Sequence, residues 1–250
     1  GYATYCRPGT DLCSTITSKV PCVNLLISMG DSWTAGVGCY NDTALDQLSR
    51  KEIHIDELMP LSLDSFAEGC WPKQLTDKLG WDLINLSNSG CSNSGQAKIL
   101  FDSIPDDLCK KYDNVFVIWL LSDAYRPSFY VDGKVRSWHG EEKFTKLCIK
   151  YARPRIEDAI LDTNFYVKCV DKFCKSNGYH FLFGNAFGIN HSLNSSHNMH
   201  NYLKNDAFSN CVSPEGFSFC GHPNAHGYSL IAGKIQEVII MTLNIQRSQK

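Results

Sequence analysis

The sequence lacks the features of a nucleic-acid-binding or membrane-spanning protein. Its 250 residues carry 24 Lys and Arg against 26 Asp and Glu, and the cations are scattered rather than clustered. This balance argues against nucleic acid as a partner. No apolar run reaches the roughly 20 residues of a membrane-spanning helix, so we expect no transmembrane segment. With 43% hydrophobic residues, the chain is long enough for one large domain with its own core.

The sequence also lacks the Cys-x-x-Cys spacing of zinc ribbons, although it holds 12 cysteines. This pattern favours disulfides, which persist mainly in oxidising compartments. Sequons at Asn41, Asn85, Asn190 and Asn194 agree with a secreted glycoprotein, although Asn85 falls in a predicted strand and is the weakest of the four. Because the chain begins at Gly1 without a signal peptide, we interpret it as a mature extracellular form. An intracellular thiol-rich protein is the alternative.

Apolar runs alternate with helical patterns along the chain. Strands are expected at 23–29, 81–86, 114–121 and 180–184. Helices are expected from 71 to a stop at Gly80, at 96–101, from 154 to just before Gly178, and from residue 223. The alternation predicts an α/β fold, a three-layer α/β/α sandwich with a mostly parallel central sheet. We expect a single domain over 1–250, with a Cys-rich N-terminal arm at 1–22 and long insertions at 40–70 and 185–221.

Two short motifs carry the functional signal. The first, Gly30-Asp31-Ser32, follows the strand pattern at 23–29 and can lift a serine hydroxyl out at the carboxyl end of a parallel strand. Ligands bind at that edge of open α/β sheets. The second motif places His222 directly before a proline and the last helix. Because a serine nucleophile needs a base within hydrogen-bond reach, the two motifs together suggest a hydrolase.

In this order the motifs resemble those of the SGNH hydrolases, also called the GDSL lipase/esterase family, and most closely its secreted, disulfide-containing members. The resemblance implies a flavodoxin-like sheet, no cofactor and no metal. It implies Ser32 as nucleophile, His222 as base, and an oxyanion hole made by the N–H groups of Ser32 and Gly90 with the Ser122 hydroxyl. Ser122 stands where the family has asparagine in its third block. Phe219 stands where the family has aspartate in its last block.

The missing aspartate leaves open what orients His222. A backbone carbonyl near Phe219 could accept the Nδ1 proton. Alternatively, the carboxylate of Glu215 or Asp206 could reach in from the long second insertion.

Three residue pairs are expected to stabilise the loops around this site: the disulfides Cys39–Cys70 and Cys211–Cys220 and the ion pair Asp123–Arg126. Cys39 and Cys70 flank the first insertion and would tie it beside the serine. The second disulfide would close a short loop just ahead of the histidine.

The sequence therefore predicts a secreted serine esterase or lipase. It would hydrolyse carboxylic esters of a lipid or of an acetylated glycan through a Ser–His dyad and an acyl-enzyme. Its partners would be small-molecule, lipid or glycan esters. The alternative is a weakly active or inactive protein that keeps the fold and binds a ligand, because two of the family's blocks are altered. The oligomeric state is left open.

Overall fold

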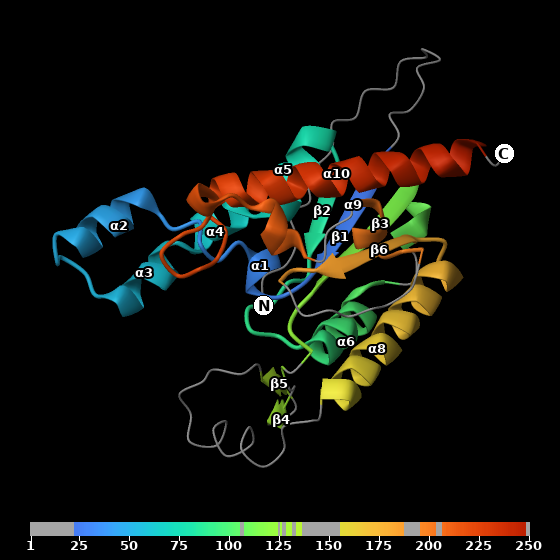
Figure 1. Cartoon of the computed structure of the whole chain (residues 1–250), viewed down its shortest axis with the longest axis horizontal. Helices are drawn as coiled ribbons and strands as arrows, with labels where there is room; N and C mark the ends of the chain where they lie inside the picture. Colours follow the sequence, from blue (N-terminus) through green and yellow to red (C-terminus); the bar gives the residue numbers. More distant parts are fainter. Residues whose placement is uncertain are drawn as a thin grey trace.

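The computed structural model describes residues 23–105, 108–124, 126, 129–131, 134–136, 156–187, 196–203 and 207–248 (Figure 1). Several predictions fall on other positions. The N-terminal arm at 1–22, Asp206, Asn190 and Asn194 all lie outside the described residues.

Four parallel strands form the central sheet. They are β1 (Asn24–Met29), β2 (Asp82–Asn85), β3 (Asn114–Leu121) and β6 (His180–Asn185), in the spatial order β2-β1-β3-β6. The strand patterns in the sequence predict all four to within a residue or two. The order is that of a flavodoxin-like sheet, whose chain switches direction between β1 and β3. The carboxyl ends of β1 and β3 therefore border the crevice where such folds bind ligands.

One face of the sheet packs on two helices from distant parts of the sequence. Leu26 and Phe116 belong to a core that includes buried residues of α5 (Trp71–Leu79) and α10 (Ala225–Ser248). Gly80 ends α5 in the left-handed conformation, as the sequence predicts. No helix in the described part of the chain is long and apolar enough to cross a membrane.

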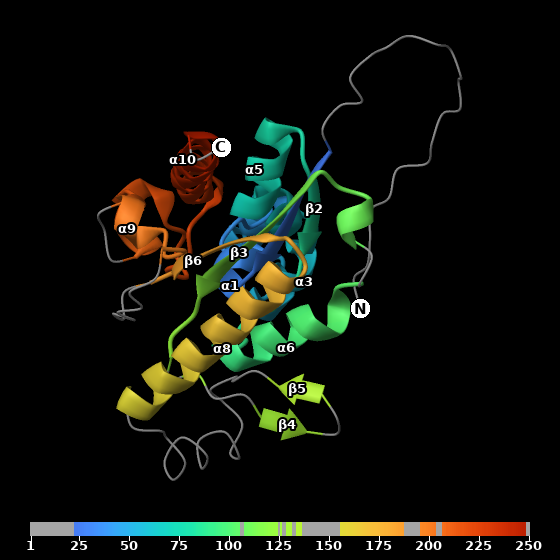
Figure 2. The same cartoon turned by 90° about the vertical axis from the view of Figure 1, so that its right-hand side faces the viewer.

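The opposite face carries a second core. Leu25 and Ile27 alternate with the residues of the first core and pack with α6 (Asn93–Ser103) and α8 (Ile156–Ser176). Figure 2 shows α6 and α8 on one side of the sheet and α5 and α10 on the other. The predicted three-layer α/β/α architecture is therefore confirmed.

The first insertion is helical. After α1 (Ser32–Ala35), the chain forms α2 (Asp42–Ser49), α3 (Ile55–Leu61) and α4 (Leu63–Gly69), and α4 leads directly into α5.

The second insertion contains α9 (His200–Leu203), the 3-10 turns η2 (Phe208–Cys211) and η3 (Pro214–Gly216), and the loop before α10. Elsewhere, a 3-10 turn η1 (Leu108–Lys110) precedes β3. An antiparallel hairpin of β4 (Phe129–Val131) and β5 (Lys134–Arg136) follows β3 and was not expected from the sequence.

Both predicted disulfides are wrong, because no disulfide joins Cys39 to Cys70 or Cys211 to Cys220. The thiol of Cys70 donates to the carbonyl of Ala67 over 3.1 Å at the end of α4. Burial raises the pKa of Cys39 to about 12 and that of Cys70 to about 11, so both stay protonated at neutral pH. Helix packing, rather than a covalent bond, closes the first insertion.

Two of the predicted glycosylation sites can be located. Asn41 is partly exposed and caps α2, where its side chain accepts the N–H of Ala44 over 3.0 Å. Asn85 lies exposed at the end of β2, and its Oδ1 accepts the hydroxyl of Ser28 over 3.0 Å. Glycosylation at either position stays a prediction.

Candidate active site

The Gly-Asp-Ser motif forms a tight strand-to-helix turn at the end of β1. Asp31 caps α1 by accepting the N–H of Trp33 over 3.0 Å, and Ser32 is the first residue of that helix. Gly30 is required by sterics, since a Cβ there would overlap the side chain of Thr34. We call residues 30–38 the serine turn. It places Ser32 at the carboxyl edge of the sheet, next to the end of β3.

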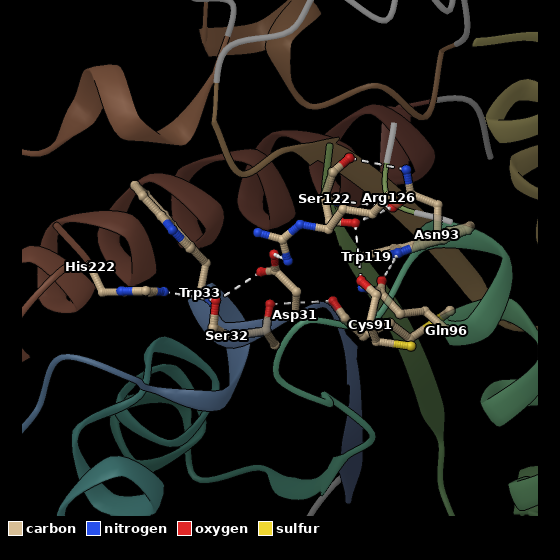
Figure 3. Close-up of polar contacts among 12 residues, drawn as sticks. Asp31, Ser32, Trp33, Cys91, Asn93, Gln96, Trp119, Ser122, Arg126 and His222 are labelled. Atoms are coloured by element: carbon tan, nitrogen blue, oxygen red, sulfur yellow. Dashed lines mark hydrogen bonds and ion pairs between the residues drawn. The ribbon is translucent and has the colours of Figure 1, made fainter. Parts of the chain in front are cut away.

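His222 meets Ser32 across this edge. Its Nε2 lies 2.8 Å from Ser32 Oγ, although the two residues are 190 positions apart (Figure 3). His222 belongs to the histidine loop (residues 217–223), which is closed by a bridge between its two end residues. Within the loop, Ser218 donates its N–H to the carbonyl of His222 over 2.8 Å. The structure thus brings together the two residues that the sequence analysis paired.

Two contacts hold the histidine loop and α10 against the serine turn. The buried hydroxyl of Tyr228, on α10, donates to the carbonyls of Val37 at 2.9 Å and Ser32 at 3.3 Å. Gly38 has a φ of 116°, and a Cβ at this position would overlap the carbonyl oxygen of Pro223. The sequence analysis missed Tyr228, because no local pattern shows that a tyrosine in an apolar helix will hydrogen-bond to a distant turn.

The Nδ1 side of His222 is held by Cys220. Its sulfur lies 3.3 Å from Nδ1, and its backbone also hydrogen-bonds to the imidazole. The proposal that the Glu215 carboxylate holds Nδ1 is wrong. A backbone carbonyl near Phe219 stays a prediction, and the backbone hydrogen bond to the ring comes from the adjacent Cys220. Phe219 sits at the outer corner of the 218–221 turn, 62% exposed, with its ring stacked on Tyr40. The Glu215 side chain lies at the protein surface.

The electrostatic surroundings keep His222 neutral. Burial is the largest effect and lowers the pKa of His222 below its usual value, and the Arg126 guanidinium lowers it further. The Asp31 carboxylate and the hydrogen bond to the Cys220 backbone act in the opposite direction. A neutral imidazole at pH 7 can accept a proton from Ser32, as a general base must.

A buried ion pair lies beside the serine. Arg126 Nη1 is 2.7 Å from Asp31 Oδ2, and the Asp31 side chain is fully buried. Burial raises the pKa of the Asp31 carboxyl, and Arg126 and the N–H of Trp33 offset part of that rise. The predicted Asp123–Arg126 ion pair is wrong, because the Arg126 guanidinium pairs with Asp31, while the backbone carbonyl of Asp123 accepts the backbone N–H of Arg126 over 3.1 Å. The guanidinium also packs over the ring of Phe187.

Ser122 does not face Ser32. Its hydroxyl is buried and lies 3.2 Å from both the Cys91 carbonyl and Asn93 Oδ1, and its own N–H donates to Asn93 Oδ1 over 2.9 Å (Figure 3). A hydroxyl has one proton, and that of Ser122 is already hydrogen-bonded to these acceptors, so it is not available to an oxyanion. The prediction of Ser122 as an oxyanion donor is therefore wrong. The buried Asn93, which the sequence analysis missed, fixes the end of β3 to α6.

Two backbone donors remain near the serine. Gly90 has a φ of 74° in a turn closed by the N–H of Cys91 and the carbonyl of Asn88, 3.0 Å apart. This turn follows β2, which pairs directly with β1. Among the described residues, none accepts the N–H of Ser32 or Gly90. Free backbone N–H groups at such an edge are the donors that stabilise an oxyanion.

Comparison with known proteins yields similarity of fold. No protein-family model and no curated protein matches the sequence. Among solved structures, an acetyl xylan esterase from the rumen bacterium Butyrivibrio proteoclasticus has a TM-score of 0.51 at 13% identity, over 91% of this chain and 66% of that one. A carbohydrate esterase has the same TM-score and identity, over 86% and 68%. The chain shares its fold with these esterases.

A third solved structure is a lipolytic protein of the G-D-S-L family from Desulfitobacterium hafniense. It is 13% identical, with a TM-score of 0.45 over 86% of this chain and 98% of that one.

Proposed function

We propose that this chain is a carboxylic ester hydrolase of the SGNH (GDSL) type, with Ser32 as nucleophile and His222 as general base. The observation that carries the proposal is the 2.8 Å contact between Ser32 Oγ and His222 Nε2 at the carboxyl edge of the sheet. A serine hydroxyl is weakly nucleophilic unless a base accepts its proton. The lowered pKa of His222 keeps that base in its active, neutral form near pH 7.

The reaction proceeds in two halves. Ser32 Oγ attacks the ester carbonyl carbon while its proton passes to His222 Nε2, which leaves the negative charge on the former carbonyl oxygen. The intermediate collapses, the bond to the alcohol breaks, and His222 returns the proton to the departing alcohol. Water then attacks the acyl-enzyme after losing a proton to His222, and Ser32 recovers that proton as the acid leaves.

We assign the stabilisation of the oxyanion to two backbone N–H groups, without the Ser122 hydroxyl that the sequence analysis added as a third donor. The N–H groups of Ser32 and Gly90 have no acceptor among the described residues and lie at neighbouring strand ends. Removing one oxyanion donor costs about 10²–10³ in rate in known hydrolases. With Ser122 engaged elsewhere, we expect slower turnover than a site with a third donor would give.

Activity-based labelling tests the proposal directly. A fluorophosphonate probe is expected to label Ser32 in the wild-type protein, and 4-nitrophenyl acetate is expected to be hydrolysed. Ser32→Ala and His222→Ala should each lower kcat by at least about 10³, and the double variant should be little worse than either, since the residues act as one unit. His226→Ala, an exposed histidine four residues further on, is the matched control and should keep full activity. Wild-type turnover in Ser32→Ala would refute the assignment.

The alternative is a ligand-binding protein with the same fold. Two observations favour it: the structure shows no carboxylate on His222 Nδ1 in its described part, and the Ser122 hydroxyl is already bonded. Replacing the aspartate of a Ser–His–Asp triad with an amide lowers kcat by about 10⁴. Absence of both labelling and turnover in the wild-type protein would favour this alternative.

We also propose that the substrate is a lipid ester or an acetylated glycan and that the protein is secreted. The Trp33 ring lies 6.5 Å from that of His222 and also contacts the rings of Phe187 and Phe217, and such an aromatic cluster suits an apolar acyl group or a sugar face. We test acetylated xylan beside 4-nitrophenyl acetate and octanoate to separate glycan from lipid esters. Secretion is tested by treating protein from a secretory host with peptide N-glycosidase, which should remove mass at Asn41 or Asn85 if either is glycosylated.

A further inference from the structure

The side of His222 that faces away from Ser32 contacts a sulfur atom. In a Ser–His–Asp triad, a carboxylate accepts the Nδ1 proton, fixes the tautomer and stabilises the imidazolium. Here the Cys220 sulfur lies 3.3 Å from Nδ1, and the backbone of the same residue also hydrogen-bonds to the ring. Its position two residues before the histidine differs from that of Phe219, three residues before it.

Cys220 is held in place by neighbours on both sides. Its sulfur lies 3.0 Å from the hydroxyl of Ser218. The Tyr40 hydroxyl also hydrogen-bonds to it, and this contact, after burial, helps to raise the pKa of the Tyr40 phenol. The 218–221 turn, closed by the N–H of Gly221 and the carbonyl of Ser218 at 3.0 Å, directs residue 220 toward the imidazole. The thiol is therefore a fixed part of the histidine loop.

We propose that Cys220 is the positioning residue of the Ser32–His222 pair, its thiol sharing the Nδ1 proton with its own backbone carbonyl. This inference rests on the proposed function. With Nδ1 protonated, Nε2 presents its lone pair to Ser32, which is the tautomer that a general base requires. A neutral sulfur stabilises the imidazolium less than a carboxylate does, so the device orients the ring more than it activates it.

Because Cys220 is exposed, a thiol reagent can reach it, and its modification should lower the activity of the Ser32–His222 pair. Of the free thiols in the described part of the chain, Cys39, Cys70, Cys91 and Cys174 are buried, whereas Cys220 is exposed. Methyl methanethiosulfonate converts an S–H group into S–S–CH₃ and releases methanesulfinate and a proton. On Cys220 this would place a methyl group against His222 and remove the thiol contact, and a reducing thiol would reverse it.

The first measurement is the kinetics of three variants. Cys220→Ala should lower kcat about tenfold with KM unchanged, the effect of losing one modest hydrogen bond in the transition state. Cys220→Ser, which keeps a polar atom at this position, should recover part of that loss. The kcat of Cys220→Asp should be higher than that of Cys220→Ala, because a carboxylate at this position stabilises the imidazolium. Cys169→Ala, a partly exposed free thiol on α8, is the control and should match wild type.

The second measurement reads His222 directly and does not depend on turnover. In ¹⁵N-histidine NMR spectra of the full chain, wild type should show the Nδ1-protonated tautomer, and Cys220→Ala should shift the His222 tautomer balance and titration. The groups around the ring are Asp31, Arg126, Ser32 and Cys220. Only the last differs between the two proteins. A change in the spectrum without any ester turnover would support the positioning role while refuting the proposed function.

Three results would overturn the inference. The first is a Cys220→Ala protein with wild-type kcat and an unchanged His222 spectrum. The second is equal inactivation of wild type and Cys220→Ser by methyl methanethiosulfonate, since the reactive thiol would then lie elsewhere. The third is a disulfide at Cys220 in the purified protein, found by non-reducing peptide mapping. If Cys220→Ala fails to fold, the reagent experiment on folded wild type and Cys220→Ser still decides.

Discussion

Removing the positive charge of Arg126 is expected to destabilise the protein strongly and in a pH-dependent way. Arg126 supplies the cation that faces the fully buried Asp31 carboxylate, and its own side chain is only 25% exposed. Arg126→Met keeps most of the side-chain length and its packing over Phe187 but removes the charge. Asp31 is then left buried without its partner, next to Ser32.

The magnitude follows from the burial. Breaking a buried ion pair by removing one partner costs about 3–5 kcal/mol, because the remaining charge stays desolvated. Since Arg126 is one-quarter exposed, we expect about 3 kcal/mol at neutral pH. An exposed pair behaves differently. Arg50 and Asp46 are 62% and 54% exposed, so Arg50→Met should change the stability by less than about 1 kcal/mol.

The pH dependence has a definite sign. The pKa of Asp31 is raised in the folded state, so its contribution to stability is complete below the unfolded value of about 3.9 and is lost as pH rises through the folded value. Without Arg126, the pKa of Asp31 in the folded state rises further, and more stability is lost at neutral pH. The free-energy difference between Arg126→Met and wild type should therefore be small near about pH 4 and largest at neutral pH.

Urea unfolding followed by circular dichroism measures this difference. Titrations at about pH 4.5 and about pH 7.5 on wild type, Arg126→Met and Arg50→Met give the free energies of unfolding. The reasoning is refuted if Arg126→Met costs no more than Arg50→Met at neutral pH. It is also refuted if the cost of Arg126→Met does not increase with pH.

Three further predictions concern the base and the contacts that hold it. The kcat/KM for ester hydrolysis should rise with pH through the His222 pKa, which burial sets below the usual value of about 6.5, and a midpoint above that value would contradict the assignment. Tyr228→Phe should lower the free energy of unfolding by about 1 kcal/mol in urea titrations, because two carbonyls of the serine turn lose their buried donor. Gly38→Ala should cost more than about 1 kcal/mol and reduce kcat, since its Cβ would overlap the Pro223 carbonyl. Gly80→Ala, which has a positive φ but open space, separates backbone strain from that overlap.

The strands and the serine turn could be predicted from the sequence because their signals are local. The apolar run at 114–121 is buried along nearly its whole length, as a central strand must be. The Gly-Asp-Ser turn follows from a strand end, a residue that tolerates no Cβ and an aspartate that caps the next helix. The helix at 71–79 ends at Gly80 for the same kind of local reason.

Apart from the Ser32–His222 contact, which the two motifs indicated, the contacts inside the site could not be predicted, because they join residues far apart in the chain. Arg126 reaches Asp31 across 95 positions, and Tyr228 reaches Ser32 across 196. The disulfide and Ser122 predictions failed for a related reason. A cysteine or serine has several possible partners within a few ångströms, and the sequence does not say which one the fold presents.

The sequence alone therefore determined the α/β architecture, since hydrophobic period and turn chemistry are properties of short segments. The order of its two motifs, and their resemblance to a known family, indicated the pairing of Ser32 with His222. Only the tertiary structure decided the surroundings of that pair: Cys220 on Nδ1, Arg126 on Asp31 and Ser122 turned toward Asn93. Such contacts depend on how the sheet edge, the serine turn and the histidine loop pack together. That packing sums weak interactions over the whole chain and leaves no local mark in the sequence.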